Sequence, residues 1–183
     1  MATALFLDRD GVINIEKDGS YIFNRDEFEF YDGARQALAT ASLKFDYTFV
    51  VTNQRGVGRG YMTEEDLKDI HAFLAEEVRD AGGRIHRIYY ATSVESDHPM
   101  RKPNTGMAAR ALEDFPDIDF SKSVMIGNNL SDMQFGKSMG MKTVFLHTTS
   151  EPVHLPHNLI DEQFPSLERW ASTLDKNMFH DIS

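Results

Sequence analysis

The chain has 183 residues, 41% of them hydrophobic, and carries 29 acidic against 19 basic residues, a formal net charge of −10. This length is typical of one domain, and the hydrophobic content suffices for a buried core, which excludes a chain disordered throughout. The negative charge argues against nucleic acid or an anionic membrane as a partner. The sequence has no cysteine, which excludes disulfides and thiolate zinc sites, and we expect a cytoplasmic protein without a transmembrane helix.

Short apolar runs alternate along the chain with amphipathic segments. The runs predict strands at residues 4–7, 47–51, 85–91, 124–126 and 143–146. They are almost continuously apolar, which is typical of strands buried on both faces of a parallel sheet.

Helical periodicity predicts helices at residues 33–42, 64–81, 106–112 and 133–139. Thr63 with Asp66, and Ser131 with Gln134, have the spacing of capping boxes, and Gly140 follows the last of these helices. Strands alternating with helices indicate a doubly wound α/β fold with a mainly parallel sheet. We expect one domain over residues 1–183, with a core at about 4–146 and a last strand and helix at about 158–175.

Polar side chains follow three of the predicted strands and precede one helix. They are Asp8 and Asp10 after the first strand, Thr52 and Asn53 after the second, Arg101 and Lys102 ahead of the helix at 106–112, and Asn128 and Asp132 after the fourth strand. Ligands of open α/β sheets bind beyond the carboxyl ends of the strands, so we expect these groups to meet at one edge.

Asp8 and Asp10 are the most informative pair. Two carboxylates at i and i+2 after a strand suit a nucleophile and a proton donor, although Asp10-Gly11 is also common turn chemistry. Lys102 can supply a point charge to a phosphate, and Arg101 can contact a second anionic or hydroxyl-bearing part of a substrate. The glycine-rich segment 56–60 lacks the spacing of a dinucleotide site and is interpreted as a flexible loop.

Taken in order, these motifs resemble the haloacid dehalogenase (HAD) superfamily of phosphohydrolases. Residues 6–14 (FLDRDGVIN), 51–54 (VTNQ) and 101–103 (RKP) are similar, more narrowly, to the group that acts on D,D-heptose 1,7-bisphosphate and histidinol phosphate. The resemblance covers about residues 4–146 and implies a HAD fold. The segments after the first two strands are short, so no substantial cap domain is expected.

The resemblance also implies roles for the polar residues. Asp8 would be the nucleophile that forms an aspartyl-phosphate, and Asp10 would protonate the leaving oxygen and then activate water. Thr52, Asn53 and Lys102 would hold the phosphoryl oxygens, and loops around Tyr21, Arg55, Arg59 and Arg101 would set specificity. Mg²⁺ would be held by Asp8, the Asp10 carbonyl and the fourth motif, where Asn128 and Asp132 are the candidate ligands.

Two departures from the group affect these expectations. The loop before Arg101 has no cysteine and a single histidine, so no structural zinc is expected. The fourth motif of the family usually opens Gly-Asp, whereas this chain has Gly127-Asn128. The amide oxygen of Asn128 can still bind Mg²⁺, but one negative charge is missing, and Asp132 can compensate either as a ligand or by orienting Lys102.

The predicted function is therefore a Mg²⁺-dependent phosphatase of a small phosphorylated metabolite. D-glycero-D-manno-heptose 1,7-bisphosphate is the first choice of substrate, and histidinol phosphate is the second. A weakened or non-catalytic phosphate-binding relative is a third alternative because of Asn128. We expect a monomer or a small homo-oligomer.

Overall fold

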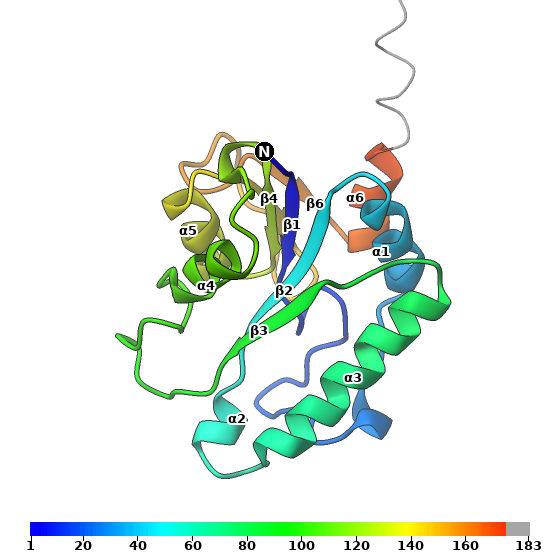
Figure 1. The fold of residues 1–183 in the computed structure, drawn as a ribbon, viewed down its shortest axis with the longest axis vertical. Coiled ribbons are helices and arrows are strands. Elements are labelled where there is room, and N and C mark those ends of the chain that lie inside the picture. Colours follow the sequence, from blue (N-terminus) through cyan, green and yellow to red (C-terminus); the bar gives the residue numbers. More distant parts are fainter. Residues whose placement is uncertain (175–183) are drawn as a thin grey trace, which may run out of the picture.

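The computed structural model describes residues 1–174, in which six strands form one parallel sheet (Figure 1). The strand order is β3-β2-β1-β4-β5-β6. The strands are β1 (Ala4–Leu7), β2 (Tyr47–Asn53), β3 (Arg87–Ala91), β4 (Val124–Gly127), β5 (Lys142–Leu146) and β6 (Glu162–Phe164). All five predicted strands and the predicted C-terminal strand are present, which confirms the α/β fold with a parallel sheet.

The chain reverses its direction across the sheet at β1. From β1 it proceeds outward through β2 to β3, then returns to the other side of β1 and proceeds through β4 and β5 to β6. Leu7, the last residue of β1, is in register with Val50 of β2 and Ile126 of β4. The switch point between β1 and β4 is where ligands of such sheets bind, so Asp8 lies at that point.

Helices cover both faces of the sheet (Figure 1). On one face lie α1 (Ala34–Ser42), α3 (Glu64–Asp80) and α6 (Leu167–Leu174), and on the other lie α4 (Gly106–Asp114) and α5 (Leu130–Ser138). Shorter helices occur at η1 (Arg25–Glu27), α2 (Arg55–Gly58) and η2 (Phe120–Lys122). The expectation of a flexible loop at residues 56–60 is therefore wrong at its start, since α2 follows β2 almost directly.

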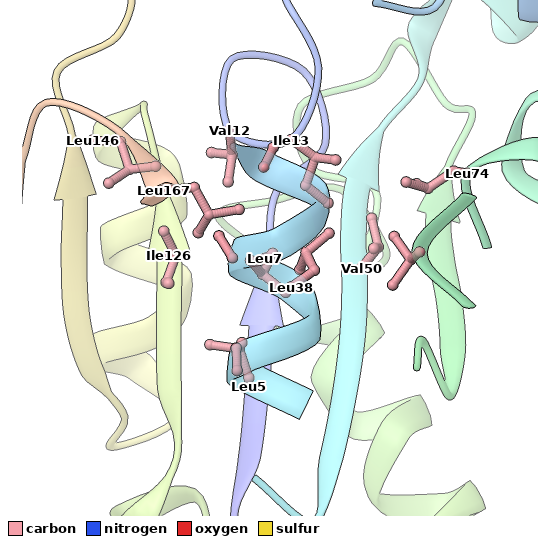
Figure 2. Packing of buried hydrophobic residues seen from close by; sticks show 14 of the residues in the cluster. Leu5, Leu7, Val12, Ile13, Leu38, Val50, Leu74, Ile126, Leu146 and Leu167 are labelled. Atoms are coloured by element: carbon pink, nitrogen blue, oxygen red, sulfur yellow. The ribbon is translucent and has the colours of Figure 1, made fainter. Parts of the chain in front are cut away.

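Alternate residues of the central strands pack into two separate cores. In β1, Leu5 and Leu7 contact the cluster that contains Leu38 of α1, whereas Phe6 points into the cluster that contains Met107 of α4. Figure 2 shows the first cluster, with Leu38 lying over the side chains of β1. A parallel strand is buried on both faces in this way, which explains why its sequence is continuously apolar.

The ends of the helices agree with the sequence in one case and differ in another. Thr63 and Asp66 form the predicted capping box at the start of α3. The predicted box of Ser131 and Gln134 is wrong, because α5 begins at Leu130, three residues before the predicted start. Its first turn is stabilised instead by Asp132, whose Oδ2 accepts the backbone N–H of Asn129 at 3.1 Å.

Within residues 1–174, no helix is long and apolar enough to cross a membrane. The single-domain organisation stays a prediction, and the end of the predicted C-terminal segment, residue 175, lies outside the described residues.

We predict that Leu38→Ala lowers the free energy of unfolding by about 2–5 kcal/mol, because Leu38 is fully buried between α1 and the sheet. Leu43→Ala, at the end of the same helix, is the matched control, since Leu43 is 81% exposed and the expected change is within about 0.5 kcal/mol. Urea denaturation of both variants measures the difference. Equal losses would contradict the placement of α1 on the sheet.

Candidate active site

The buried ammonium group of Lys102 lies between two carboxylates that are far apart in the sequence. Its Nζ lies 2.9 Å from Asp8 Oδ1 and 2.7 Å from Asp132 Oδ1. The Lys102 side chain is 1% exposed. A charge removed from water to this extent requires close partners of opposite charge, and these two carboxylates supply them.

Asn53, at the end of β2, holds the backbone of Lys102. Its Oδ1 accepts the Lys102 N–H at 3.0 Å, and its Nδ2 donates to the Lys102 carbonyl at 3.1 Å. Both polar atoms of the Asn53 side chain are thus engaged. These contacts support a role in placing Lys102 more directly than the predicted contact with phosphate.

Asp132 fixes the turn after β4 as well as Lys102. Its Oδ2 accepts backbone N–H groups from Asn128 at 3.2 Å and from Asn129 at 3.1 Å, while Oδ1 contacts Lys102. Both carboxylate oxygens therefore have partners within the protein. Of the two roles considered for Asp132, these contacts support the orientation of Lys102.

Asp10 lies two residues after Asp8 and is held by three side chains. Its Oδ1 accepts from Arg9 Nη2 and from Asn14 Nδ2, both at 2.9 Å, and its Oδ2 accepts from Gln54 Nε2 at 2.8 Å. The Gln54 amide also donates to the hydroxyl of Thr52 at 2.8 Å. Thr52 is thereby placed beside the carboxylates, as its position at the end of β2 predicts.

The surroundings shift the pKa values of the two aspartates in opposite directions. Burial raises the pKa of Asp8 to about 7, the charge of Asp132 adds to the shift, and Lys102 opposes it. Burial would also raise the pKa of Asp10, but the Arg9 charge and hydrogen bonds from Asn14, Arg9 and Gln54 outweigh it and lower that pKa. In the metal-free site Asp8 therefore holds a proton more tightly than Asp10 does.

Lys102 remains charged in this setting. Burial alone would lower its pKa, yet the charges of Asp132 and Asp8 outweigh burial and raise the pKa above its usual value. A permanent positive charge thus lies beside Asp8, where it can neutralise a phosphoryl group.

The amide of Asn128 lies beside the carboxylate of Asp8 and the backbone carbonyl of Asp10. One amide atom of Asn128 lies 3.3 Å from Asp8 Oδ2 and 3.2 Å from the carbonyl oxygen of Asp10. With nitrogen at this place the amide donates to both oxygens, and with oxygen there the three atoms form the all-oxygen set that a hard cation prefers. These residues therefore fit a divalent cation, although no cluster of three His, Cys, Asp or Glu side chains suited to a metal occurs within residues 1–174.

A cavity of about 620 Å³ opens above these groups. Asp8, Asp10 and Lys102 lie in its wall, together with Glu16 and Tyr21 from the segment after β1. Burial raises the pKa of Glu16, and the charge of Asp10 adds to the shift.

Besides Arg9, three arginines line the same cavity: Arg55, Arg59 and Arg101. The Arg101 guanidinium donates to the Ser93 carbonyl at 3.2 Å, and that of Arg59 to the Tyr21 hydroxyl at 3.1 Å. Burial lowers the pKa of Arg101, and the charges of Arg55 and Arg59 add to this shift. This side of the cavity is therefore positively charged in an otherwise acidic protein.

The structure adds residues that the sequence motifs did not reveal. Arg9, Asn14 and Gln54 hold Asp10, and Glu16 lines the same cavity. Arg9 lies between the two aspartates, which was the available signal, but nothing in the sequence shows that Asn14 and Gln54 point toward Asp10.

Comparison with known proteins identifies this arrangement. A family described as HAD-hydrolase-like matches residues 99–162. D-glycero-alpha-D-manno-heptose-1,7-bisphosphate 7-phosphatase of Campylobacter jejuni is 38% identical over 143 residues, which are 78% of this chain and 81% of the relative. This chain belongs to the HAD-like phosphatases. The expected resemblance to the HAD superfamily and to its heptose bisphosphate group is confirmed.

Two further proteins are similar to this chain, one in sequence and one in fold. D-glycero-beta-D-manno-heptose-1,7-bisphosphate 7-phosphatase of Pasteurella multocida is 33% identical over 160 residues, 84% of this chain and 85% of the relative. The fold is that of D,D-heptose 1,7-bisphosphate phosphatase from B. bronchiseptica, crystallised with magnesium and phosphate. That match has a TM-score of 0.84 and 23% identity, and covers 96% of this chain and 99% of the other.

We predict that Asp8→Asn stabilises the metal-free protein at pH 8 and changes its stability little at pH 4. The pKa of Asp8 is about 7 in the folded protein against 3.8 in an exposed chain, so the folded state binds a proton more tightly. Stability then falls as pH rises through this window, and the amide, which does not ionise, removes the loss.

Urea denaturation with a metal chelator across pH 4–8 measures the effect, which we expect to be on the order of 1–3 kcal/mol at pH 8. Asp117→Asn, outside the site, is the control. A wild-type curve that is flat across this range would contradict the raised pKa of Asp8.

Proposed function

We propose that this chain is a Mg²⁺-dependent phosphatase that hydrolyses D-glycero-D-manno-heptose 1,7-bisphosphate through an aspartyl-phosphate on Asp8. The observation that carries the proposal is the Lys102 ammonium group bound to Asp8 at 2.9 Å, with Asp10 beside it and a cationic cavity above. Relatives from Campylobacter jejuni and Pasteurella multocida bear the name of this activity.

In the first step Asp8 attacks the phosphorus atom of the substrate. Lys102 stays beside the attacking carboxylate and neutralises the charge of the phosphoryl oxygens. The hydroxyl of Thr52 stabilises a phosphoryl oxygen by donating a hydrogen bond to it. An anionic phosphoryl group near Asp10 raises the pKa of that carboxyl, which is otherwise held low by Arg9. Protonated Asp10 then donates to the departing sugar oxygen.

In the second step the ionised Asp10 takes a proton from water, and the resulting hydroxide equivalent attacks the phosphorus of the aspartyl-phosphate. Arg9, Asn14 and Gln54 stabilise the ionised form that this step requires. Asp8 departs as a carboxylate next to Lys102.

Asp8, the Asp10 carbonyl and Asn128 would hold the cation. A bound Mg²⁺ supplies positive charge that keeps Asp8 ionised and offsets the charge of the phosphoryl group. Asn128 provides an oxygen without a negative charge, so we expect the metal to bind more weakly than with an aspartate at position 128. Glu16 adds a carboxylate nearby.

The arginines favour a bisphosphate over histidinol phosphate. Arg55, Arg59 and Arg101 lie in the cavity with Lys102, so a substrate whose far end carries a second phosphate meets positive charge there. Histidinol phosphate carries an amine at its far end, which these side chains would repel. One of these relatives is named for the alpha anomer of the substrate and the other for the beta anomer, so both anomers are tested below.

We expect the chain to release one phosphate per molecule of heptose 1,7-bisphosphate, and Asn128→Asp to lower the Mg²⁺ concentration at half-maximal rate by about tenfold, since it restores one charge. Asp8→Asn should be inactive. Phosphate release from both anomers and from histidinol phosphate, at rising Mg²⁺, is the measurement. If the wild-type protein releases no phosphate at any Mg²⁺ concentration while the Asn128→Asp variant is active, the chain is a disabled phosphatase instead.

We expect Arg101→Ala to raise KM for the bisphosphate by about 10–100-fold, because a desolvated charge pair contributes roughly 1.4–3 kcal/mol. KM for the corresponding 7-monophosphate should change less than about threefold, since that substrate has no phosphate at position 1. Steady-state kinetics on both esters distinguish the two effects. Arg110→Ala, on the exposed side of α4, is the control.

The cytoplasmic location, the single domain and a monomeric or small oligomeric state remain predictions of the sequence. The one sheet formed by strands from both ends of the chain supports the single domain.

A further inference from the structure

Arg9 is a fully buried arginine within the catalytic motif itself. It is 1% exposed, lies between Asp8 and Asp10 in sequence, and donates to Asp10 Oδ1 through Nη2 at 2.9 Å and Nε at 3.3 Å. The ring of Phe28 lies 5.8 Å from its guanidinium carbon. One edge of the guanidinium is therefore fixed on the carboxylate, and Nη1 on the other edge requires an acceptor of its own.

That partner is His71, which comes from the middle of α3. Its Nε2 lies 3.2 Å from Arg9 Nη1, and the residue is 7% exposed. An arginine has only donors, so Nε2 must accept, and the imidazole must be neutral with its proton on Nδ1. Burial lowers the pKa of His71 to about 3, and the Arg9 charge adds to the shift, which agrees with a neutral acceptor.

His71 is itself held in place. The ring of Tyr90 on β3 lies 5.6 Å from the imidazole, and the Tyr90 hydroxyl donates to Glu64 at the start of α3 at 2.5 Å. The capping box of Thr63 and Asp66 fixes the first turn of the same helix. The acceptor for Arg9 thus belongs to a rigid element rather than to a loop.

We propose that His71 is a positioning residue, which through Arg9 fixes the carboxylate of Asp10 for transfer of a proton to the leaving oxygen. The inference rests on the proposed phosphatase activity and assigns to α3 a part in the chemistry. Without an acceptor at His71, Arg9 loses a partner for a buried donor, and its guanidinium is free to rotate away from the geometry that holds Asp10.

This role has a specific kinetic signature. A sugar alkoxide is a poor leaving group and needs a proton from Asp10, whereas 4-nitrophenolate leaves readily without one. Misplacing Asp10 therefore slows hydrolysis of the sugar phosphate more than that of 4-nitrophenyl phosphate. A general loss of packing slows both equally.

The test compares kcat on the two esters for wild type, His71→Leu, His71→Gln and Leu74→Ala. We expect His71→Leu to lower kcat on heptose bisphosphate by about 10–100-fold, with KM little changed and less than about a threefold loss on 4-nitrophenyl phosphate. His71→Gln places an amide oxygen near the position of Nε2 and should recover most of the rate. Leu74→Ala removes a buried side chain of the same helix and should leave the ratio of the two rates unchanged.

A second readout does not depend on activity. A long-range ¹H–¹⁵N spectrum of the wild-type imidazoles should show His71 as the neutral form with the proton on Nδ1 throughout pH 5.5–8. Equal losses on both esters in His71→Leu, no recovery in His71→Gln, or a proton found on Nε2 would each overturn the positioning role. A wild type that hydrolyses neither ester at any Mg²⁺ concentration would overturn the proposed function itself.

Discussion

The buried charge of Lys102 is the constraint on which the rest of the site depends. A lysine with a side chain 1% exposed is tolerable only between anionic partners, and those partners come from the end of β1 and from the first turn of α5. Asn53 then fixes the backbone of the lysine from β2. Lys102 is thus held by groups at or after the ends of three different strands, two of them through its ammonium group and one through its backbone.

The same constraint explains how two neighbouring aspartates acquire different properties. Asp8 shares Lys102 with Asp132, and burial with that second negative charge raises its pKa to about 7. Asp10 has its own cation in Arg9, together with two amide donors, and its pKa is lowered. Proximity in sequence therefore does not mean a shared environment. Asp8 meets Lys102, whereas Asp10 meets Arg9, Asn14 and Gln54.

The sequence predicted the fold through local patterns that the structure retains. Continuous apolar strands require helices on both faces, and Thr63 with Asp66 begins α3 as its spacing indicates. The start of α5 was misplaced because Asp132 was interpreted as a candidate ligand or as a group that orients Lys102, while its contacts also include the backbone N–H groups of Asn128 and Asn129. A residue that serves both a helix end and a buried lysine carries no pattern that distinguishes the two.

Part of the wall of the cavity is exposed, whereas the residues at its floor are buried in the fold. Residues 16–21 line the cavity in part, and none of them is buried, whereas Asp8 and Lys102 are enclosed among the strands. Changes in this segment therefore leave both hydrophobic cores intact. A scaffold with this separation can acquire new substrate preferences by drift in one exposed segment while its phosphoryl chemistry is inherited unchanged.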